Sequence, residues 1–410
     1  MLNAAQEREL AYVVIIDGIE PIPGYDRVEH AIVGGWRVIV QKDQFKPGDP
    51  AIYFEIDSRV PSDKECFAFL EKRNYKIKTL KMCKTISQGL LMHASDFGWT
   101  IENSAIDDHS VIIDNEGQPH YATDESRFLT KKLGITYADD EDNQRKAPSV
   151  DKYKKMASRH QKLFKHPVFR WLMKREWGRK LLFTFFGKKK DKKNGWPSWV
   201  AKTDEERVQN MPWILNSEEK WIATEKIDGT STTFTMRRKP FGRKEFYVCS
   251  RNVCFDKVNK PCYYDTNVYW EMAKKYRIYE VLTDLLKKYP KEEWITIQGE
   301  TYGAGIQKRD YSRDDHHFIT FNLVFSSRGR VGTKEMWKII TAYNVPCVPI
   351  IEEDIVFTDK FATIDDLLLW ADGDSQIDHH LPREGIVFRT MDGKKSFKAV
   401  SNSYLLKYHT

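Results

Sequence analysis

The sequence predicts an α+β chain with a small β-domain at residues 1–140, a basic helical insert at residues 141–200 and a larger α+β domain at residues 201–410. Short β-rich runs separated by turn residues fill the first part. Lysines and arginines concentrate in the second part. In the third part, strand-like runs alternate with helical patterns. A chain of 410 residues is long enough for two or three hydrophobic cores.

The first part has the pattern of a small barrel or sandwich. Its β-rich runs are residues 12–16, 36–40, 51–56, 75–82 and 89–93. A turn at residues 45–49, which contains Pro47 and Gly48, joins the second run to the third.

The third part alternates between the two-residue periodicity of strands and the roughly 3.6-residue periodicity of helices. The strands that we predict are residues 221–224, 231–236, 246–249, 295–298, 318–325, 385–389 and 396–400. Helical spacing predicts helices at residues 268–289 and 334–343. Strands interleaved with helices indicate an α+β domain.

The basicity of the chain is concentrated in the basic segment, residues 152–194. This segment holds sixteen Lys and Arg residues against two acids, and because the whole chain carries +7, the remainder is net acidic. Apolar residues at near-helical spacing predict one or two amphipathic helices with a cationic face. Three interpretations are open: solvated helices, a nucleic-acid contact and an anionic membrane contact. Interleaved aromatic residues favour the nucleic acid.

Composition excludes several classes of protein. Mean hydropathy is −0.59, and no stretch approaches the roughly 18 apolar residues of a membrane span. The first ten residues lack the apolar core of a secretory signal. The six cysteines form no C-x-x-C pair, so we expect reduced thiols, no zinc site and a cytoplasmic or other intracellular location. We expect the pairs His316-His317 and His379-His380 to be loop residues.

The motif that best fits a catalytic site is KIDGT at residues 226–230, between two predicted strands. Lys226 is a candidate nucleophile if its amine is partly neutral. Burial and nearby cations lower a lysine pKa, whereas carboxylates oppose this unless a metal neutralises them. Asp228 and Glu225 could hold such a metal, and Gly229 would let the backbone approach a nucleotide. Taken alone, the motif also fits an ordinary turn with an exposed lysine.

Five companion motifs follow in order along the chain. They are SR (250–251), GETYG (299–303), FITFN (318–322), EGIV (384–387) and SFK (396–398). With KIDGT, this order and spacing resemble the six motifs of the covalent nucleotidyltransferases, which comprise DNA ligases, RNA ligases and capping enzymes. DNA ligases and capping enzymes place a barrel after the last motif, whereas only twelve residues follow Lys398. The resemblance therefore favours the RNA ligases.

Three motifs in the first domain and one just before KIDGT narrow the resemblance to one group of RNA ligases. GWRV (35–38), YFEIDS (53–58), ISQGL (86–90) and KTDEERVQN (202–210) are similar to ATP-dependent RNA ligases of the Naegleria and Deinococcus type. The similarity covers the chain except for the insert around the basic segment. It implies an N-terminal OB-like barrel and a C-terminal adenylyltransferase domain, ATP-grasp-like and built of antiparallel sheets and helices.

The resemblance implies roles for the candidate nucleophile and for the acidic residues of the motifs. Lys226 would be the site of AMP attachment. Asp228 and Glu384 would organise Mg²⁺ or Mn²⁺ through its waters, and Glu300 would bind the ribose. Carboxylates suit these hard cations.

It also implies roles for cations and for one aromatic residue. Lys398 would hold the α-phosphate, and Arg207 would lie near the phosphates or the 5′-phosphate end. Arg251 would contact phosphate, although a surface ion pair is the alternative. Phe321 would stack on adenine, although it could be plain core.

Two positions depart from the pattern of the family. Val400 stands where RNA ligases often carry a second lysine, so Lys395, Lys407 or another basic residue would have to replace it. Asn322 stands where many relatives carry aspartate, which weakens any charge role there.

These observations predict an ATP-dependent RNA ligase that joins 3′-hydroxyl and 5′-phosphate ends through a lysyl-AMP. The alternatives are a capping-type guanylyltransferase and a nucleic-acid-binding protein that has kept the fold. The expected cofactors are ATP and Mg²⁺ or Mn²⁺. The expected partner is RNA, as free ends or a nicked duplex, and we expect a monomer.

Overall fold

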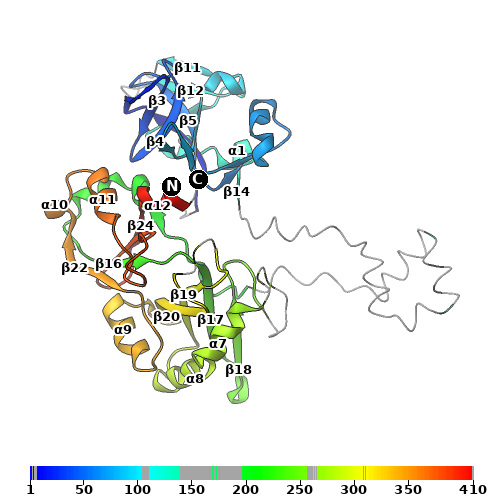
Figure 1. Cartoon of the computed structure of the whole chain (residues 1–410). Helices are drawn as coiled ribbons and strands as arrows, with labels where there is room; N and C mark the ends of the chain where they lie inside the picture. The colour runs from blue at the N-terminus through cyan, green and yellow to red at the C-terminus, as the bar shows by residue number, and fades with distance from the viewer. Residues whose placement is uncertain are drawn as a thin grey trace.

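The computed structural model describes residues 1, 3, 7–103, 110–138, 166, 169, 172, 175, 196–255, 262, 264, 266–307, 309 and 311–408. Two domains lie one above the other, and both chain ends lie near their junction (Figure 1). The predicted helices of the basic segment fall outside the described residues, apart from four isolated positions.

The N-terminal domain is built of short strands. They are β1 (Ala11–Ile15), β2 (Gly18–Ile22), β3 (Tyr25–Val33), β4 (Trp36–Gln41), β5 (Pro50–Phe54), β6 (Ser58–Arg59), β7 (Lys76–Ile77), β8 (Leu80–Met82), β9 (Thr85–Ser87), β10 (Leu90–Met92), β11 (Thr100–Asn103), β12 (Ser110–Ile113), β13 (Pro119–His120) and β14 (Thr136–Tyr137). The described residues of this domain also form three 3₁₀ helices, Glu65–Arg73, Ala94–Phe97 and Glu125–Arg127, and a one-turn helix, α1 (Thr130–Leu133).

Strand β5 lies between two hydrophobic cores. It pairs antiparallel with β1 on one side and β10 on the other. Tyr53 packs into a core with Trp36, whereas Ile52 and Phe54 pack into a second core with Phe67. Alternate residues of a strand face opposite sides, so β5 is buried throughout. The prediction located β1, β4, β5 and β10 but missed β3, whose first half is largely exposed and lacks a run of apolar residues.

The C-terminal domain contains longer elements. Its strands are β15 (Glu206–Arg207), β16 (Lys220–Lys226), β17 (Thr230–Arg238), β18 (Lys244–Cys249), β19 (Trp294–Gly303), β20 (His316–Phe325), β21 (Gly329–Arg330), β22 (Ile350–Val356), β23 (Gly385–Thr390) and β24 (Ser396–Val400). Its helices are α7 (Val268–Lys275), α8 (Ile278–Lys288), α9 (Thr333–Thr341), α10 (Phe357–Lys360), α11 (Ile364–Ala371) and α12 (Asn402–Tyr408).

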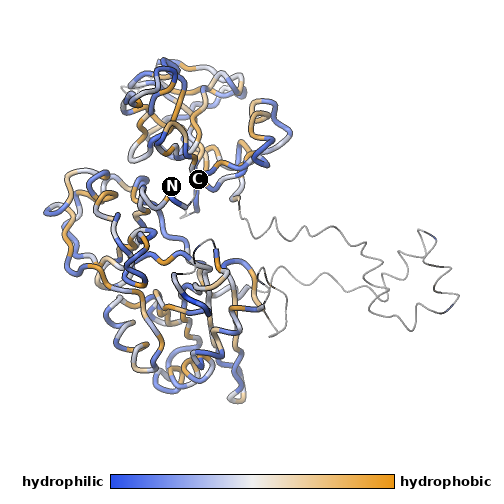
Figure 2. The backbone as a smooth tube through the Cα atoms, in the orientation of Figure 1, coloured by the Kyte–Doolittle hydropathy of each residue, from blue (hydrophilic) through white to orange (hydrophobic). Residues whose placement is uncertain are grey.

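Within the described residues these strands form two five-stranded sheets. One has the order β15-β24-β23-β16-β22 and the other β18-β17-β19-β20-β21. All pairings are antiparallel except that of β15 with β24. Residues of α7, α8 and α9 share a core with the second sheet, and residues of α10 and α11 share one with the first. Hydrophobic segments accordingly run through the interior of each domain (Figure 2).

The predicted helix at residues 268–289 is wrong in one respect, because it is two helices. Arg277 separates α7 from α8 with φ 51°, in the left-handed region that a helix interior does not contain. Apolar residues continue on both sides, with Met272 and Leu282 in the same core. Periodicity therefore continued across a break that only the backbone reveals.

The chain crosses from one sheet to the other through the KIDGT motif. Lys226 is the last residue of β16 and Thr230 is the first of β17. A Cβ on Gly229 would lie 2.3 Å from the carbonyl oxygen of Thr301, so only glycine fits this crossing. The glycine thus allows close packing against β19, and it also lines the cavity, so the approach to a nucleotide stays a prediction.

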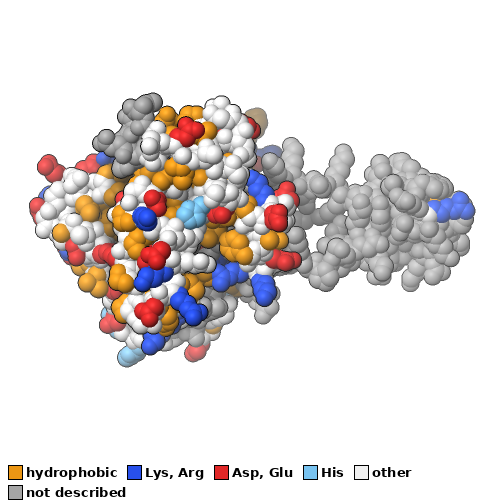
Figure 3. All heavy atoms as spheres, turned by 90° about the horizontal axis from the view of Figure 1, so that it is seen from above, with side chains coloured by type: hydrophobic (Ala, Val, Ile, Leu, Met, Phe, Trp, Pro, Cys, Tyr) orange, Lys and Arg blue, Asp and Glu red, His pale blue; other side chains and the backbone are white. Residues whose placement is uncertain are grey.

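The two domains dock through a buried polar contact. Asn210 donates to the Glu55 carboxylate at 2.8 Å and accepts from the Trp36 indole at 2.7 Å. At the rim, Arg37 forms two hydrogen bonds to Asp365, at 2.6 and 2.7 Å. On the face seen from above, acidic and basic side chains of the described residues are interspersed (Figure 3).

Candidate active site

A cavity of about 460 Å³ lies where the two sheets of the C-terminal domain meet the N-terminal domain. This volume is within the usual range for a small-molecule site. All eight residues that the sequence predicted for the site line the cavity. They are Arg207, Lys226, Asp228, Arg251, Glu300, Phe321, Glu384 and Lys398.

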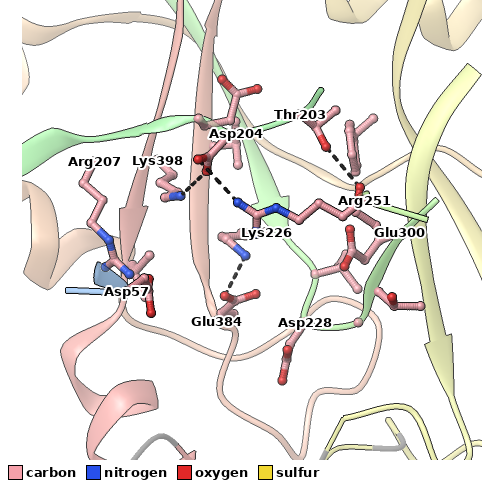
Figure 4. A pocket seen from close by; sticks show the side chains of 18 of the residues that line it. Asp57, Thr203, Asp204, Arg207, Lys226, Asp228, Arg251, Glu300, Glu384 and Lys398 are labelled. Carbon is pink, nitrogen blue, oxygen red and sulfur yellow. Dashed lines mark hydrogen bonds and ion pairs between the residues drawn. The ribbon is translucent and has the colours of Figure 1, made fainter. Parts of the chain in front are cut away.

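Lys226 lies at the centre of the acidic side of the cavity (Figure 4). Its amine donates to Glu384 Oε1 at 2.6 Å, and the antiparallel register sets Lys226 opposite Gly385, next to that glutamate. Burial lowers the pKa of Lys226, but the charges of Glu384 and Glu300 more than offset this and raise it above its ordinary value. In the ligand-free protein, Lys226 is therefore a protonated partner of carboxylates.

Two further carboxylates flank this lysine. Glu300 projects from β19, and burial raises its pKa to about 8 despite the positive charge of Lys226. Asp228 follows β16, and its backbone N–H donates to the Tyr311 hydroxyl at 2.7 Å. Its carboxylate accepts a hydrogen bond from Tyr404. Figure 4 shows this carboxylate turned away from the Lys226 amine.

The cationic side of the cavity surrounds Asp204. Lys398 lies 3.3 Å from this carboxylate, Arg251 3.4 Å and Arg8 2.7 Å. Burial alone would raise the Asp204 pKa, but the three cations hold it well below its usual range. Burial lowers the pKa of Lys398. Sequence reasoning missed Asp204, although it lies within the quoted motif KTDEERVQN.

Parallel pairing of β15 with β24 sets Arg207 beside Lys398. Arg207 is buried, and two of its guanidinium nitrogens, Nε and Nη1, have no hydrogen-bond partner among the described residues. Its guanidinium lies 5.9 Å from the centre of the Trp36 ring of the N-terminal domain. A buried cation with free donors beside a cavity is suited to an anionic ligand.

The position of Phe321 is compatible with both interpretations of the sequence, a ring that stacks on adenine and a core residue. It projects from β20 into the cavity and packs against Ile227 and Val348, which also line it. Phe318, three residues earlier, lies on the other face of the sheet in the main core. Phe321 is therefore part of a small apolar cluster whose surface forms one wall of the cavity.

The structure locates the positions where the sequence departs from the family pattern. Lys395 pairs with Glu219 at 2.7 Å on the surface, and neither it nor Lys407 lines the cavity. Lys78 of the N-terminal domain does. Asn322 donates to Gln298 at 3.1 Å within the sheet, which is a structural contact.

The N-terminal domain contributes a wall that the sequence did not predict. Asp57, Lys78, Thr79 and Tyr137 line the cavity, and Arg251 donates to the Tyr137 hydroxyl at 3.0 Å. Asp57 lies within the quoted motif YFEIDS, whereas no quoted motif contains Lys78, Thr79 or Tyr137.

Histidines and cysteines lie apart from this chemistry. His316 and His317 begin β20, so the prediction that they are loop residues is wrong; His379 and His380 lie in a turn. His316 lies 2.9 Å from Glu271. All six cysteines are free thiols. Among the described residues, no three His, Cys, Asp or Glu side chains are grouped closely enough to hold a metal by themselves.

No helix in the described part of the chain is long and apolar enough to span a membrane.

Comparisons with protein families identify both domains. Residues 10–94 match an OB-fold domain, and residues 219–408 match the RNA ligase family. The chain therefore contains an N-terminal OB-fold domain and a C-terminal domain of the RNA ligase family, which confirms the predicted fold class. These matches support the ligase hypothesis rather than the capping enzyme or the non-catalytic binding protein.

Solved structures extend the similarity to the whole chain. The RNA ligase of Naegleria gruberi with pyrophosphate is 25% identical, with 98% of this chain and 99% of that chain covered and a TM-score of 0.67. Two point mutants of that enzyme, one with AMP and Mn and one with ATP and Mn, are each 25% identical with TM-scores of 0.66; they cover 98% of this chain, and 99% and 100% of theirs. A comparison with curated protein sequences gave no match.

Proposed function

We propose that Lys226 takes AMP from ATP, passes it to the 5′-phosphate end of an RNA and thereby allows a 3′-hydroxyl end to be joined. One observation carries this proposal: a lysine among carboxylates faces a group of cations across a single cavity. The carboxylates suit a divalent ion, and the cations suit the phosphates of ATP.

The residues present fit a divalent cation. Asp228 and Glu384 offer the oxygen donors that Mg²⁺ and Mn²⁺ prefer. Two carboxylates suit an ion that is also held through its waters and the phosphates of ATP. Such a cation would offset the negative charge around Lys226 and at the α-phosphate. Relatives solved with ATP or AMP and Mn support this assignment.

The first step needs a neutral Lys226 amine. In the ligand-free protein Glu384 keeps it protonated, so the amine must lose a proton once the charge of that carboxylate is offset. The nitrogen lone pair then attacks the α-phosphorus, a P–N bond forms, and the P–O bond to pyrophosphate breaks. Lys398 and Arg251 would stabilise charge on the phosphates as the bond changes.

The next two steps use the same cavity. An oxygen of the RNA 5′-phosphate attacks the phosphorus of lysyl-AMP, which releases Lys226 and leaves the end activated as a mixed anhydride. Arg207, with its free donors, is placed beside Lys398 to receive that 5′-phosphate. The 3′-hydroxyl then attacks the activated phosphorus, forms the phosphodiester and expels AMP.

The remaining wall would bind the adenosine. Phe321 presents a ring for stacking on the base, with Val348 beside it. Glu300 lines the same cavity, where its carboxylate can accept hydrogen bonds from a ribose hydroxyl.

The same observations support three coarser assignments. RNA is the expected macromolecular partner, as a nick or as free ends, because both domains are of nucleic-acid-handling types. A monomer suffices, since one chain supplies every residue of the cavity. Free thiols suit an intracellular location. Light scattering of the purified protein would test the monomer.

The proposal is tested by the adduct and by its fate. With ATP and Mn²⁺ the intact mass of the protein should increase by one AMP, and GTP should give no adduct. Adding a nicked RNA duplex with a 5′-phosphate should discharge the adduct and yield the joined strand. A DNA nick of the same sequence measures the preference of the protein for RNA over DNA. An adduct with GTP alone, or an adduct that no RNA end discharges, would contradict the ligase assignment.

A further inference from the structure

Helix α12 brings a tyrosine into contact with the aspartate of the KIDGT motif. The hydroxyl of Tyr404 donates to Asp228 Oδ2, although the two residues are 176 positions apart. On the other side of Asp228, its backbone N–H donates to Tyr311 at 2.7 Å. Two phenols therefore hold one residue, one through its backbone and one through its carboxylate.

The position of the Tyr404 hydroxyl is fixed from several directions. Its side chain is fully buried. The Tyr408 ring lies 4.9 Å from it, and the Arg309 guanidinium lies 5.4 Å from its centre. Arg309 is itself buried and 4.0 Å from the centre of the Tyr311 ring, so one cation rests against both phenols that hold Asp228.

The OB-fold domain also fixes the helix that carries Tyr404. Leu405 packs against Ile86 of that domain and against Val400 at the end of β24. Lys81 of the same domain donates to the carbonyl of Leu406 at 3.4 Å. Helix α12 is therefore held at the junction of the domains, and the Tyr404 ring cannot move freely.

We propose that Tyr404 is a positioning residue for lysine adenylylation, which fixes the Asp228 carboxylate so that its second oxygen serves the divalent cation. This inference rests on the proposed function. A carboxylate on a short side chain rotates readily, and one strong donor on Oδ2 removes that freedom while leaving Oδ1 available. Because Asp228 is turned away from the Lys226 amine, it suits contact with a hydrated ion better than a direct ion pair.

The size of the expected effect follows from comparable sites. Hydrogen-bond partners of carboxylates that serve metals typically contribute about 10- to 100-fold in metal affinity or activity. Tyr404→Phe removes only the hydroxyl and keeps the buried ring. Its matched control is Tyr408→Phe, which makes the same change on the same helix at a residue with no contact to Asp228 among the described interactions.

The test measures metal binding as well as rate. Single-turnover AMP transfer to each protein is followed by intact mass across a Mn²⁺ series, and Mn²⁺ affinity of each adenylylated protein is measured by electron paramagnetic resonance. We expect Tyr404→Phe to need about tenfold more Mn²⁺ for the half-maximal rate and to bind Mn²⁺ more weakly. Saturating Mn²⁺ should restore much of its rate, and Tyr408→Phe should behave as wild type.

Each other outcome contradicts the inference in a distinct way. A uniform loss at all Mn²⁺ levels, with a lower melting temperature, would make Tyr404 a packing residue only. A normal or lowered Mn²⁺ requirement would show that the phenol does not hold Asp228 for the metal. If the wild-type protein forms no adduct, the proposed function fails instead, so the two failures are distinguishable.

Discussion

The two sides of the cavity have opposite arrangements of charge. On one side, the cation Lys226 lies among carboxylates, with Glu384 nearest, and its pKa is raised. On the other side, the anion Asp204 lies among cations, with Lys398 among them, and its pKa is lowered. Each group of like charges is thus partly offset by one opposite charge of the protein itself.

This comparison shows what ATP and a divalent cation have to replace. A cation near Glu384 competes with the Lys226 amine for the carboxylate, and phosphates compete with Asp204 for its cations. Both exchanges release a protein charge that stabilised the empty cavity. The pairs keep the charged side chains in place without a ligand and break when the ligand supplies the same charge.

The largest effect should come from removing the nucleophile. Lys226→Ala should abolish the AMP adduct, because it removes the amine that lies between Glu384 and Glu300 in the cavity. Intact mass after incubation with ATP and Mn²⁺ measures this. An adduct that survives the substitution would place the nucleophile on the cationic side, at Lys398. It would contradict the assignment of the nucleophile to the acidic side.

Removing a carboxylate from the acidic side should have the next largest effect. Asp228→Ala and Glu384→Ala should each slow adduct formation about a hundredfold, or about 3 kcal/mol, since metal-assisted charge stabilisation is lost. The single-turnover rate at low Mn²⁺ is the measurement. If both variants adenylylate at nearly normal rates, these carboxylates are structural.

A third prediction separates the cations of the cavity from those of the basic segment. Replacing Lys188, Lys189, Lys190, Lys192 and Lys193 with Ser should weaken RNA binding and lower its salt dependence by about 0.7 to 0.9 per lost phosphate contact. Adenylylation should not change, because the cavity is untouched. Gel shifts and adduct formation are compared across a salt series. Equal loss of both activities would instead give the segment a role in folding.

Removing the negative charge of Asp204, at the centre of the cationic side, should have a smaller effect. Asp204→Asn removes the internal anion, so ATP and pyrophosphate no longer compete with it, and both should bind about two- to fivefold more tightly. Calorimetric titration of the Lys226→Ala background avoids turnover. Asp354→Asn, an exposed carboxylate near Lys220, is the control. Weaker binding in Asp204→Asn would show that the aspartate orients its cations for phosphate.

The smallest predicted effect is on stability. The pKa of Glu300 is raised from 4.5 to about 8, so the folded state binds a proton more tightly than the unfolded chain, and stability falls as pH rises between these values. Glu300→Gln should remove this fall. Its melting temperature should exceed that of the wild type above pH 8 and approach it in mild acid. Parallel melting curves across pH would contradict the buried, charge-crowded position of Glu300.

Much of the site could be predicted from the sequence because the motif residues sit at fixed places on strands. Lys226 ends one strand, Glu300 and Phe321 lie on two neighbouring ones, and Lys398 lies on the last. Pairing and alternation within each sheet, together with the crossing between the two sheets at KIDGT, then bring them together. The motifs therefore predicted the fold class and eight of the residues that line the cavity, whose individual roles stay predictions.

Tertiary structure alone decided the contacts that no local pattern encodes. Asp204 is contacted by Arg8 of the other domain, and Tyr404, which contacts Asp228, lies on α12, whose Leu405 packs against the OB-fold domain. The break at Arg277 was hidden for a related reason, since apolar spacing continues across it. Periodicity reports which face of an element is buried. It does not report which distant residue will meet that face, because that depends on how the domains pack.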